Sequence, residues 1–174
     1  MVKYFSIQDD ALIKTQNLSD AFWTYPENPD DDELLLHSTQ LNIDLDDLKS
    51  ALDINEISRV EFNDDHIFFI LKVPLYLKTK EIKFYTEPIG FFIFSDRVLS
   101  VCLSNNNVLS YFMGINKSTS LQSPYTFIIS ILNRTASQYL KMLTEINKRT
   151  SYIEKELQES MKNKELIRLL NLEK

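Results

Sequence analysis

The segment from Ser123 to Lys174 constrains the fold most, because it contains neither glycine nor proline after Pro124. Ser123 and Pro124 suit the N-cap and the first position of a helix. Apolar or small residues then recur at alternating steps of four and three, at Leu132, Ala136, Tyr139, Leu143, Ile146, Thr150, Ile153 and Leu157. This spacing is typical of a helix that packs lengthwise against another helix. The sequence therefore predicts a helix from Pro124 to about Ser160, roughly 55 Å long at ~1.5 Å per residue, which is longer than a domain of this size can cover.

The heptad pattern becomes indistinct at residues 160–163. Asn163 is a suitable N-cap, and a new apolar run follows at Leu166, Ile167, Leu169, Leu170 and Leu172. We interpret this segment as the turn of a helical hairpin whose second arm is interrupted at Lys174. The alternative is one continuous helix with a solvated end. In both cases the pattern stops without a cap, so we expect the chain to be a fragment of a longer protein.

The charge of the chain is unevenly distributed. The net charge is −6, and thirteen acidic residues lie between Glu27 and Asp65, against Lys49 and Arg59 as the basic ones. Such an acidic block repels nucleic acid and attracts cations. The alternative is an ordinary solvated acidic face.

The composition excludes several other classes of protein. We find no run of about 18 apolar residues that could span a bilayer, and the N-terminus carries acidic residues where a signal peptide would be apolar. The single cysteine, Cys102, lies in an apolar run and is predicted to be an inert buried thiol. No disulfide can form within the chain, which fits the cytoplasm.

The residues before the long helix alternate strand and helix patterns. Strands are predicted at 2–7, 11–14, 21–25, 59–62, 66–77, 81–85, 89–94 and 97–103, and helices at 30–41, 45–52 and 105–115. Pro74, inside the long strand at 66–77, implies an edge position or a bulge. The fold class is therefore α+β: an α/β/α-type domain at 1–122 with a mixed, largely antiparallel sheet, followed by the long helical segment at 123–174.

The sequence contains no recognisable enzyme constellation. Glycine-rich phosphate loops, a nucleophile elbow, and paired cysteine or histidine metal motifs are all missing. His37 and His66 share no ligand spacing, and His66, next to Asp64 and Asp65, is predicted to be a surface residue. We therefore expect a protein that is not an enzyme.

Several strings resemble, in order and spacing, the N-terminal cytoplasmic domain of the CorA-type divalent-metal-ion transporters. They are Trp23, Leu41–Ile43 with the helix after it, Arg59–Phe62 with Ile67–Val73, Glu87–Phe94 with Arg97–Val101, and Tyr125–Leu143. The resemblance covers roughly residues 20 to 174. It implies the cytoplasmic, regulatory or gating domain of a magnesium or cobalt transporter that is a homopentamer in full length, at the inner side of the plasma membrane. The family's Gly-Met-Asn pore motif would lie beyond Lys174, and Met113–Asn116 does not match it.

The resemblance also suggests where divalent cations would bind. The family often senses Mg²⁺ with carboxylates between neighbouring subunits, at positions where this chain has Lys49 with Ser50, and Asn133. A hard divalent ion prefers negatively charged oxygen ligands. The candidate ligands for regulatory Mg²⁺, with Co²⁺ or Zn²⁺ as alternatives, are therefore Asp46, Asp47, Asp53 and Asn133.

A second function remains open. The chain could be a free-standing soluble scaffold that binds a partner through the helix at Pro124–Leu157. An apolar stripe at helical spacing fits either function, since both place a partner helix on it.

Overall fold

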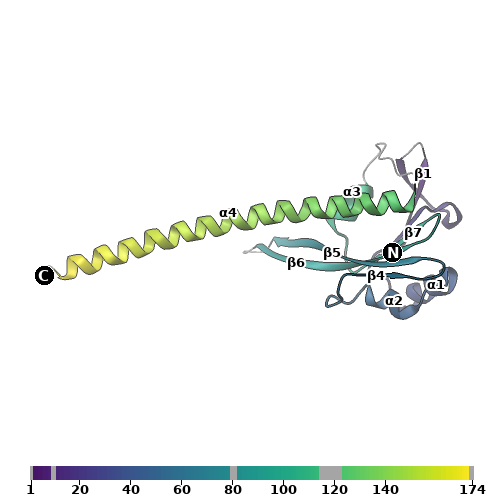
Figure 1. The fold of residues 1–174 in the computed structure, drawn as a ribbon, viewed down its shortest axis with the longest axis horizontal. Helices are drawn as coiled ribbons and strands as arrows, with labels where there is room; N and C mark the ends of the chain where they lie inside the picture. Colours follow the sequence, from purple (N-terminus) through teal and green to yellow (C-terminus); the bar gives the residue numbers. More distant parts are fainter. Residues whose placement is uncertain (1, 9–10, 79–81, 114–122, 173–174) are drawn as a thin grey trace. The chain divides into compact units, whose positions relative to one another are not determined.

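The computed structural model describes residues 2–8, 11–78, 82–113 and 123–172. The chain divides into two units, residues 1–136 and residues 137–174. The first unit contains the sheet, the short helices and the first turns of the long helix, as Figure 1 shows. The second unit is the remainder of that helix.

The order of helices and strands begins with the predicted strands and ends with the predicted long helix. They are β1 (Val2–Gln8), β2 (Ala11–Thr15), the 3-10 turn η1 (Leu18–Asp20), β3 (Trp23–Pro26), α1 (Asp31–Leu41), α2 (Leu45–Ser50), β4 (Arg59–Phe62), β5 (Ile67–Lys78), β6 (Ile82–Ile93), β7 (Val98–Cys102), α3 (Asn107–Met113) and α4 (Pro124–Leu172). The seven strands form one sheet in the order β2-β1-β3-β7-β6-β5-β4. β3 and β7 pair in parallel and the other described neighbours pair antiparallel, which confirms the mixed α+β fold.

Helices cover both faces of the sheet (Figure 1). Successive residues of a strand point to opposite faces, so Phe91 and Phe92 of β6 enter different cores. Phe91 lies in a cluster with Trp23 and with Phe127 of α4. Phe92 lies in a second cluster with Leu48 of α2. The first cluster also includes α3, so α3 and the start of α4 cover one face while α1 and α2 cover the other.

Two buried polar contacts fix the centre of the sheet. The indole Nε1 of Trp23 donates to the Ser100 Oγ at 2.8 Å, and the Cys102 thiol donates to the Tyr25 hydroxyl oxygen at 3.3 Å. Burial is the main reason that the pKa of Cys102 rises to about 12. The prediction of a buried thiol is confirmed, and the sulfur stays protonated at neutral pH.

Pro74 occupies an edge position, as predicted. β4 pairs with β5 only from Ile67 to Ile70, whereas Pro74 pairs with Thr86 of β6. The amide of Lys72 points to the β4 side, where it donates to the Ser58 Oγ. The nitrogen of Pro74, two residues on, faces the same side, so its missing N–H removes no hydrogen bond from the β5–β6 ladder.

Three sequence-based predictions were wrong. The segments at 81–85 and 89–94 are not separate strands, because β6 runs unbroken from Ile82 to Ile93 beside β5. The hairpin turn at 160–163 does not form: α4 continues to Leu172, as the alternative of one continuous helix predicts, and no glycine or proline interrupts it. His66 is buried rather than on the surface, with its ring against Phe92 and Phe94.

The last two residues of the predicted helix at 105–115 lie outside the described residues. The described part of that helix is α3.

Candidate functional site

The candidate residues Asp46 and Asp47 lie in the first turn of α2. Asp44 is the N-cap, and its carboxylate accepts from the Asp46 amide at 2.9 Å. Acidic side chains are favourable there because they face the positive end of the helix dipole. Leu48 and Ala51 anchor the opposite side of the helix in the core. The carboxylate of Asp46 is therefore exposed and that of Asp47 is half-buried.

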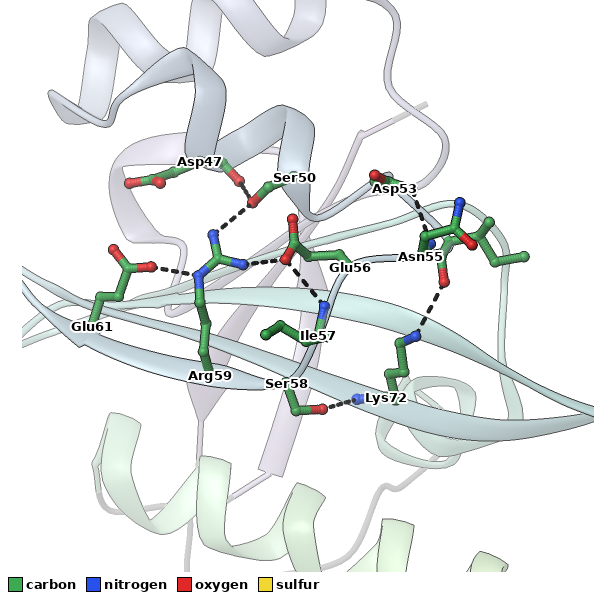
Figure 2. A network of polar contacts seen from close by, with 11 residues as sticks. Asp47, Ser50, Asp53, Asn55, Glu56, Ile57, Ser58, Arg59, Glu61 and Lys72 are labelled. Atoms are coloured by element: carbon green, nitrogen blue, oxygen red, sulfur yellow. Dashed lines mark hydrogen bonds and ion pairs between the residues drawn. The ribbon is translucent and has the colours of Figure 1, made fainter.

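Arg59 of β4 joins the C-terminal end of α2 to the sheet (Figure 2). Its guanidinium forms an ion pair with Glu56 at 2.6 Å and another with Glu61. It also donates to the Ser50 Oγ at 3.4 Å. The Ser50 hydroxyl in turn donates to the backbone carbonyl of Asp47 at 2.8 Å. In this network two glutamates largely neutralise the positive charge of Arg59. Arg59 therefore compensates the negative charges of the nearby aspartates only weakly.

The pKa of Asp47 is raised. The largest cause is desolvation by burial, followed by the negative charges of Glu61 and Asp44, while Arg59 and His66 act in the opposite direction. The ionised carboxylate of Asp47 is thus incompletely compensated by its surroundings. A cation bound nearby would favour the ionised form.

An open hollow of about 440 Å³ lies beside α2. Four aspartates, Asp44, Asp47, Asp64 and Asp65, line it together with Asn42, Phe62, Asn63 and His66. The Nε2 of His66 lies 3.1 Å from the Asn63 amide nitrogen, and burial lowers the pKa of the imidazole. A neutral imidazole adds no positive charge to this hollow, so the aspartates dominate its electrostatic potential.

The other two candidate residues lie elsewhere. Asp53 follows α2, and its carboxylate accepts from the Asn55 amide at 2.9 Å, which stabilises the turn before β4. Figure 2 shows this turn, where the Lys72 ammonium donates to the Ile54 carbonyl at 3.2 Å. Asn133 is an exposed residue of α4, on the helix that covers the opposite face of the sheet from α2.

One chain therefore brings Asp46 and Asp47 together but not all four candidates. Within residues 2–8, 11–78, 82–113 and 123–172, no group of three or more histidine, cysteine, aspartate or glutamate side chains is arranged to hold a metal ion. A divalent ion at α2 would have to complete its coordination with water or with ligands from another molecule.

The sequence-based reasoning missed the Arg59 network and the burial of His66. The acidic block contains the residues of this network, but the pairing of Arg59 with Glu56, Glu61 and Ser50 depends on how α2 docks on β4. The one local signal was the single arginine among thirteen acids, which is a natural centre for ion pairs.

Among the described residues, no helix combines the length and the apolar character that a membrane span requires.

Comparisons with known proteins agree on one family. The model of the family described as CorA-like Mg²⁺ transporter protein matches residues 19–174. A curated relative, the cobalt/magnesium transport protein CorA of Methanocaldococcus jannaschii, is 24% identical over 189 residues. That alignment covers 100% of this chain and 57% of the relative, so the chain spans little more than half of the relative's length.

Solved structures share the fold. The soluble domain of CorA from M. jannaschii has a TM-score of 0.71 at 23% identity, covering 90% of this chain and 63% of that one. The complete CorA magnesium transporter of the same organism has a TM-score of 0.68 at 20% identity, covering 90% and 51%. The full-length CmaX protein has a TM-score of 0.67 at 9% identity, covering 88% and 50%.

Proposed function

The chain belongs to the CorA-like Mg²⁺ transporter family, and from that premise we propose that it is the cytoplasmic regulatory part of a magnesium or cobalt transporter. In this proposal divalent cations bind between adjacent copies of the chain and favour one state of the assembly. The observation that carries it is the acidic hollow beside α2, which has four aspartates but no complete set of metal ligands within the described chain.

The electrostatics of the hollow support a bridging ion. Two carboxylates about 4 Å apart repel by ~1 kcal/mol in water and by more when they are partly buried. Asp47 already sits in such a partly buried position near Asp44 and Glu61. A divalent cation between two copies would relieve this repulsion. It would shift the equilibrium only as far as its affinity differs between the two states.

The second unit supports self-association. Ile153 and Leu157 of α4 are 55% and 58% exposed, and Met161 and Ile167 on the same helix are 63% and 58% exposed. An apolar stripe of this kind is ordinarily covered by another helix. We propose that copies of this chain cover it in the full-length homopentamer. Binding of a different partner helix, in a free-standing scaffold, is the alternative that the same stripe favours.

The test is a cation titration of the chain with Mg²⁺, Co²⁺ and Zn²⁺, at constant ionic strength maintained with a monovalent salt. We expect the midpoint of thermal unfolding to rise and the sedimenting species to grow with divalent cation. At a cation concentration ten times the dissociation constant, the gain in stability is about 1.4 kcal/mol. No change in either quantity would contradict cation sensing by this chain.

Paired variants locate the effect. Asp47→Asn with Asp65→Asn, which neutralises two of the four aspartates that line the hollow, should remove most of the divalent response. Glu154→Gln with Glu165→Gln removes the same two charges from exposed positions of α4 and should leave the response intact. An equal loss in both pairs would mean that net charge, rather than the α2 site, controls the response. A concentration-dependent assembly that ignores divalent cations would favour the scaffold.

A further inference from the structure

A cavity separate from the acidic hollow lies between α1 and β7, with a volume of about 340 Å³. Its walls are mainly apolar and include Leu18, Leu41, Phe94, Val98 and Leu99. An apolar cavity of ~150 Å³ is enough to hold benzene. This cavity is therefore large enough for a small organic ligand, at the lower end of the range of known ligand sites.

The cavity contains one buried polar group without a partner. His37 of α1 lines the cavity and is only 2% exposed. Its Nε2 has no hydrogen-bond partner among the described residues. Leaving such an atom unpaired is unfavourable, whereas the other buried polar side chains at the centre of the sheet, such as Trp23 and Ser100, pair with each other. A ligand in the cavity could supply the missing partner.

The surroundings of the cavity favour an uncharged ligand. Arg97 also lines the cavity, but its guanidinium forms an ion pair with the Asp96 carboxylate, with an Nη2–Oδ2 distance of 2.8 Å. The two charges offset each other. Burial lowers the pKa of His37, so its imidazole is neutral at physiological pH. Neither an anion nor a cation would find an uncompensated opposite charge on these side chains.

We propose that this cavity binds a small uncharged alcohol or phenol. The apolar body of the ligand packs on Leu41, Phe94 and Leu99, and its hydroxyl pairs with the His37 Nε2. A hydroxyl fits because it can donate to a bare ring nitrogen or accept from a protonated one. A ketone could serve only one of these tautomers. This inference is independent of the cation site, so its failure would not affect the proposed transport role.

The experiment titrates the chain with phenol and with toluene, which replaces the hydroxyl by a methyl group, and follows the methyl resonances of Leu41 and Leu99 by NMR. His37→Leu should weaken phenol binding by about threefold to tenfold, the equivalent of one hydrogen bond. Toluene binding should not weaken. Benzoate, the charged analogue, should bind more weakly than phenol. Equal losses for phenol and toluene would overturn the role of His37.

A second variant keeps the proposal testable if His37→Leu does not fold. Ser19 lines the cavity and is exposed, so Ser19→Trp should fill the opening and abolish phenol binding. Ser151→Trp, on an exposed position of α4, is the matched control and should bind phenol normally. In the unmodified chain, phenol should shift the His37 Nε2 resonance but not that of His66. The proposal would be overturned if millimolar phenol had no effect on these resonances. It would also be overturned if Ser19→Trp left phenol binding unchanged.

Discussion

Gly90 of β6 lies directly beneath Ala51, the C-cap of α2: a methyl group at Gly90 would come within 2.4 Å of the Ala51 Cβ. Ala51 is fully buried. The absence of a side chain at Gly90 lets the end of α2 rest on the sheet. This contact determines the distance between α2 and β6. It thereby also determines the position of the aspartates in the first turn of the helix.

Replacing Gly90 by alanine should therefore destabilise the protein by about 1–3 kcal/mol, the usual cost of overpacking a core. The free energy of unfolding, measured by urea denaturation, checks this. Adding Ala51→Gly removes the clashing methyl group, so the double variant should recover part of the loss. Additive losses in the double variant would show that the two residues do not compete for the same space.

The contact between Trp23 and Ser100 offers a second test. The indole donates to the Ser100 hydroxyl inside the core, where both residues are 0% exposed. Ser100→Ala leaves the indole N–H unpaired and should cost about 1–3 kcal/mol. Because Trp23 is the single tryptophan, its fluorescence reports the change directly. Ser151→Ala, at an exposed position of α4, is the control and should have little effect; an equal loss there would contradict the assignment.

The sequence was sufficient to predict the fold where the patterns are local. The run from His66 to Leu77 is apolar and β-branched enough to predict β5, and the helix signal after Pro124 needs only side-chain spacing. The sequence predicts two strands in place of β6, with Pro88 in the gap between them, because proline breaks strands on average. Pairing with β5 along the whole of β6 outweighs that tendency. The alternative of one continuous helix past Ser160 is confirmed, because a weak heptad pattern is no obstacle to a helix.

The site was less predictable, because its geometry depends on contacts between distant segments. Asp46 and Asp47 are predicted as candidates because they lie on the helix where the resemblance implies metal-sensing carboxylates. Their neighbours are Arg59, in β4, and His66, in the loop before β5, and no local pattern specifies how these segments align with α2. In addition, the position of His66 directly after two aspartates predicts a surface residue. Its ring is buried because it packs against the rings of Phe92 and Phe94, which is a tertiary effect.

The two buried histidines predict how stability depends on pH. Burial lowers the pKa of His37, against the charge of Glu33, and the pKa of His66, against Asp47 and Asp65. The folded state keeps both rings neutral while the unfolded state takes up protons below about pH 6.5. The two neutral rings should therefore contribute fully to the free energy of unfolding above pH 6.5. This contribution should be lost as the pH decreases through the folded-state pKa values, by at most about 1.4 kcal/mol per pH unit for each ring.

Urea denaturation at a series of pH values between 7.5 and about 5 measures this dependence. His37→Gln should reduce the slope, because glutamine cannot take up a proton in this range. The same substitution at an exposed, non-titrating position, Ser151→Gln, should leave the slope unchanged. A pH-independent free energy of unfolding in the unmodified protein would contradict the assignment of neutral, buried imidazoles.

Asp47 should show opposite effects on stability and on cation binding. Its raised pKa means that the ionised carboxylate is less favourable in the folded protein than in the unfolded chain. The folded state therefore loses relative stability as the pH rises through that pKa. Asp47→Asn should raise the thermal midpoint slightly at pH 7 without cation, and reduce the rise that Mg²⁺ produces. Asp32→Asn on α1 is the charge-matched control; the same two effects there would contradict a local role for Asp47.

The exposed stripe of α4 leads to the last prediction. Ile153 and Leu157 lie four residues apart on one side of a helix whose neighbouring side chains are exposed. Because they are not part of the described core, Ile153→Lys with Leu157→Lys should barely change the unfolding of the sheet unit. If another helix covers the stripe, two lysines would introduce unpaired charges into that interface, and association should weaken at least tenfold.

Sedimentation velocity over a range of concentrations measures this effect. Ser151→Lys with Gln158→Lys adds the same charge on a different side of α4 from the stripe and should associate like the unmodified chain. If both pairs associate equally, α4 does not pair through Ile153 and Leu157, and its apolar residues must be covered by something other than a second copy.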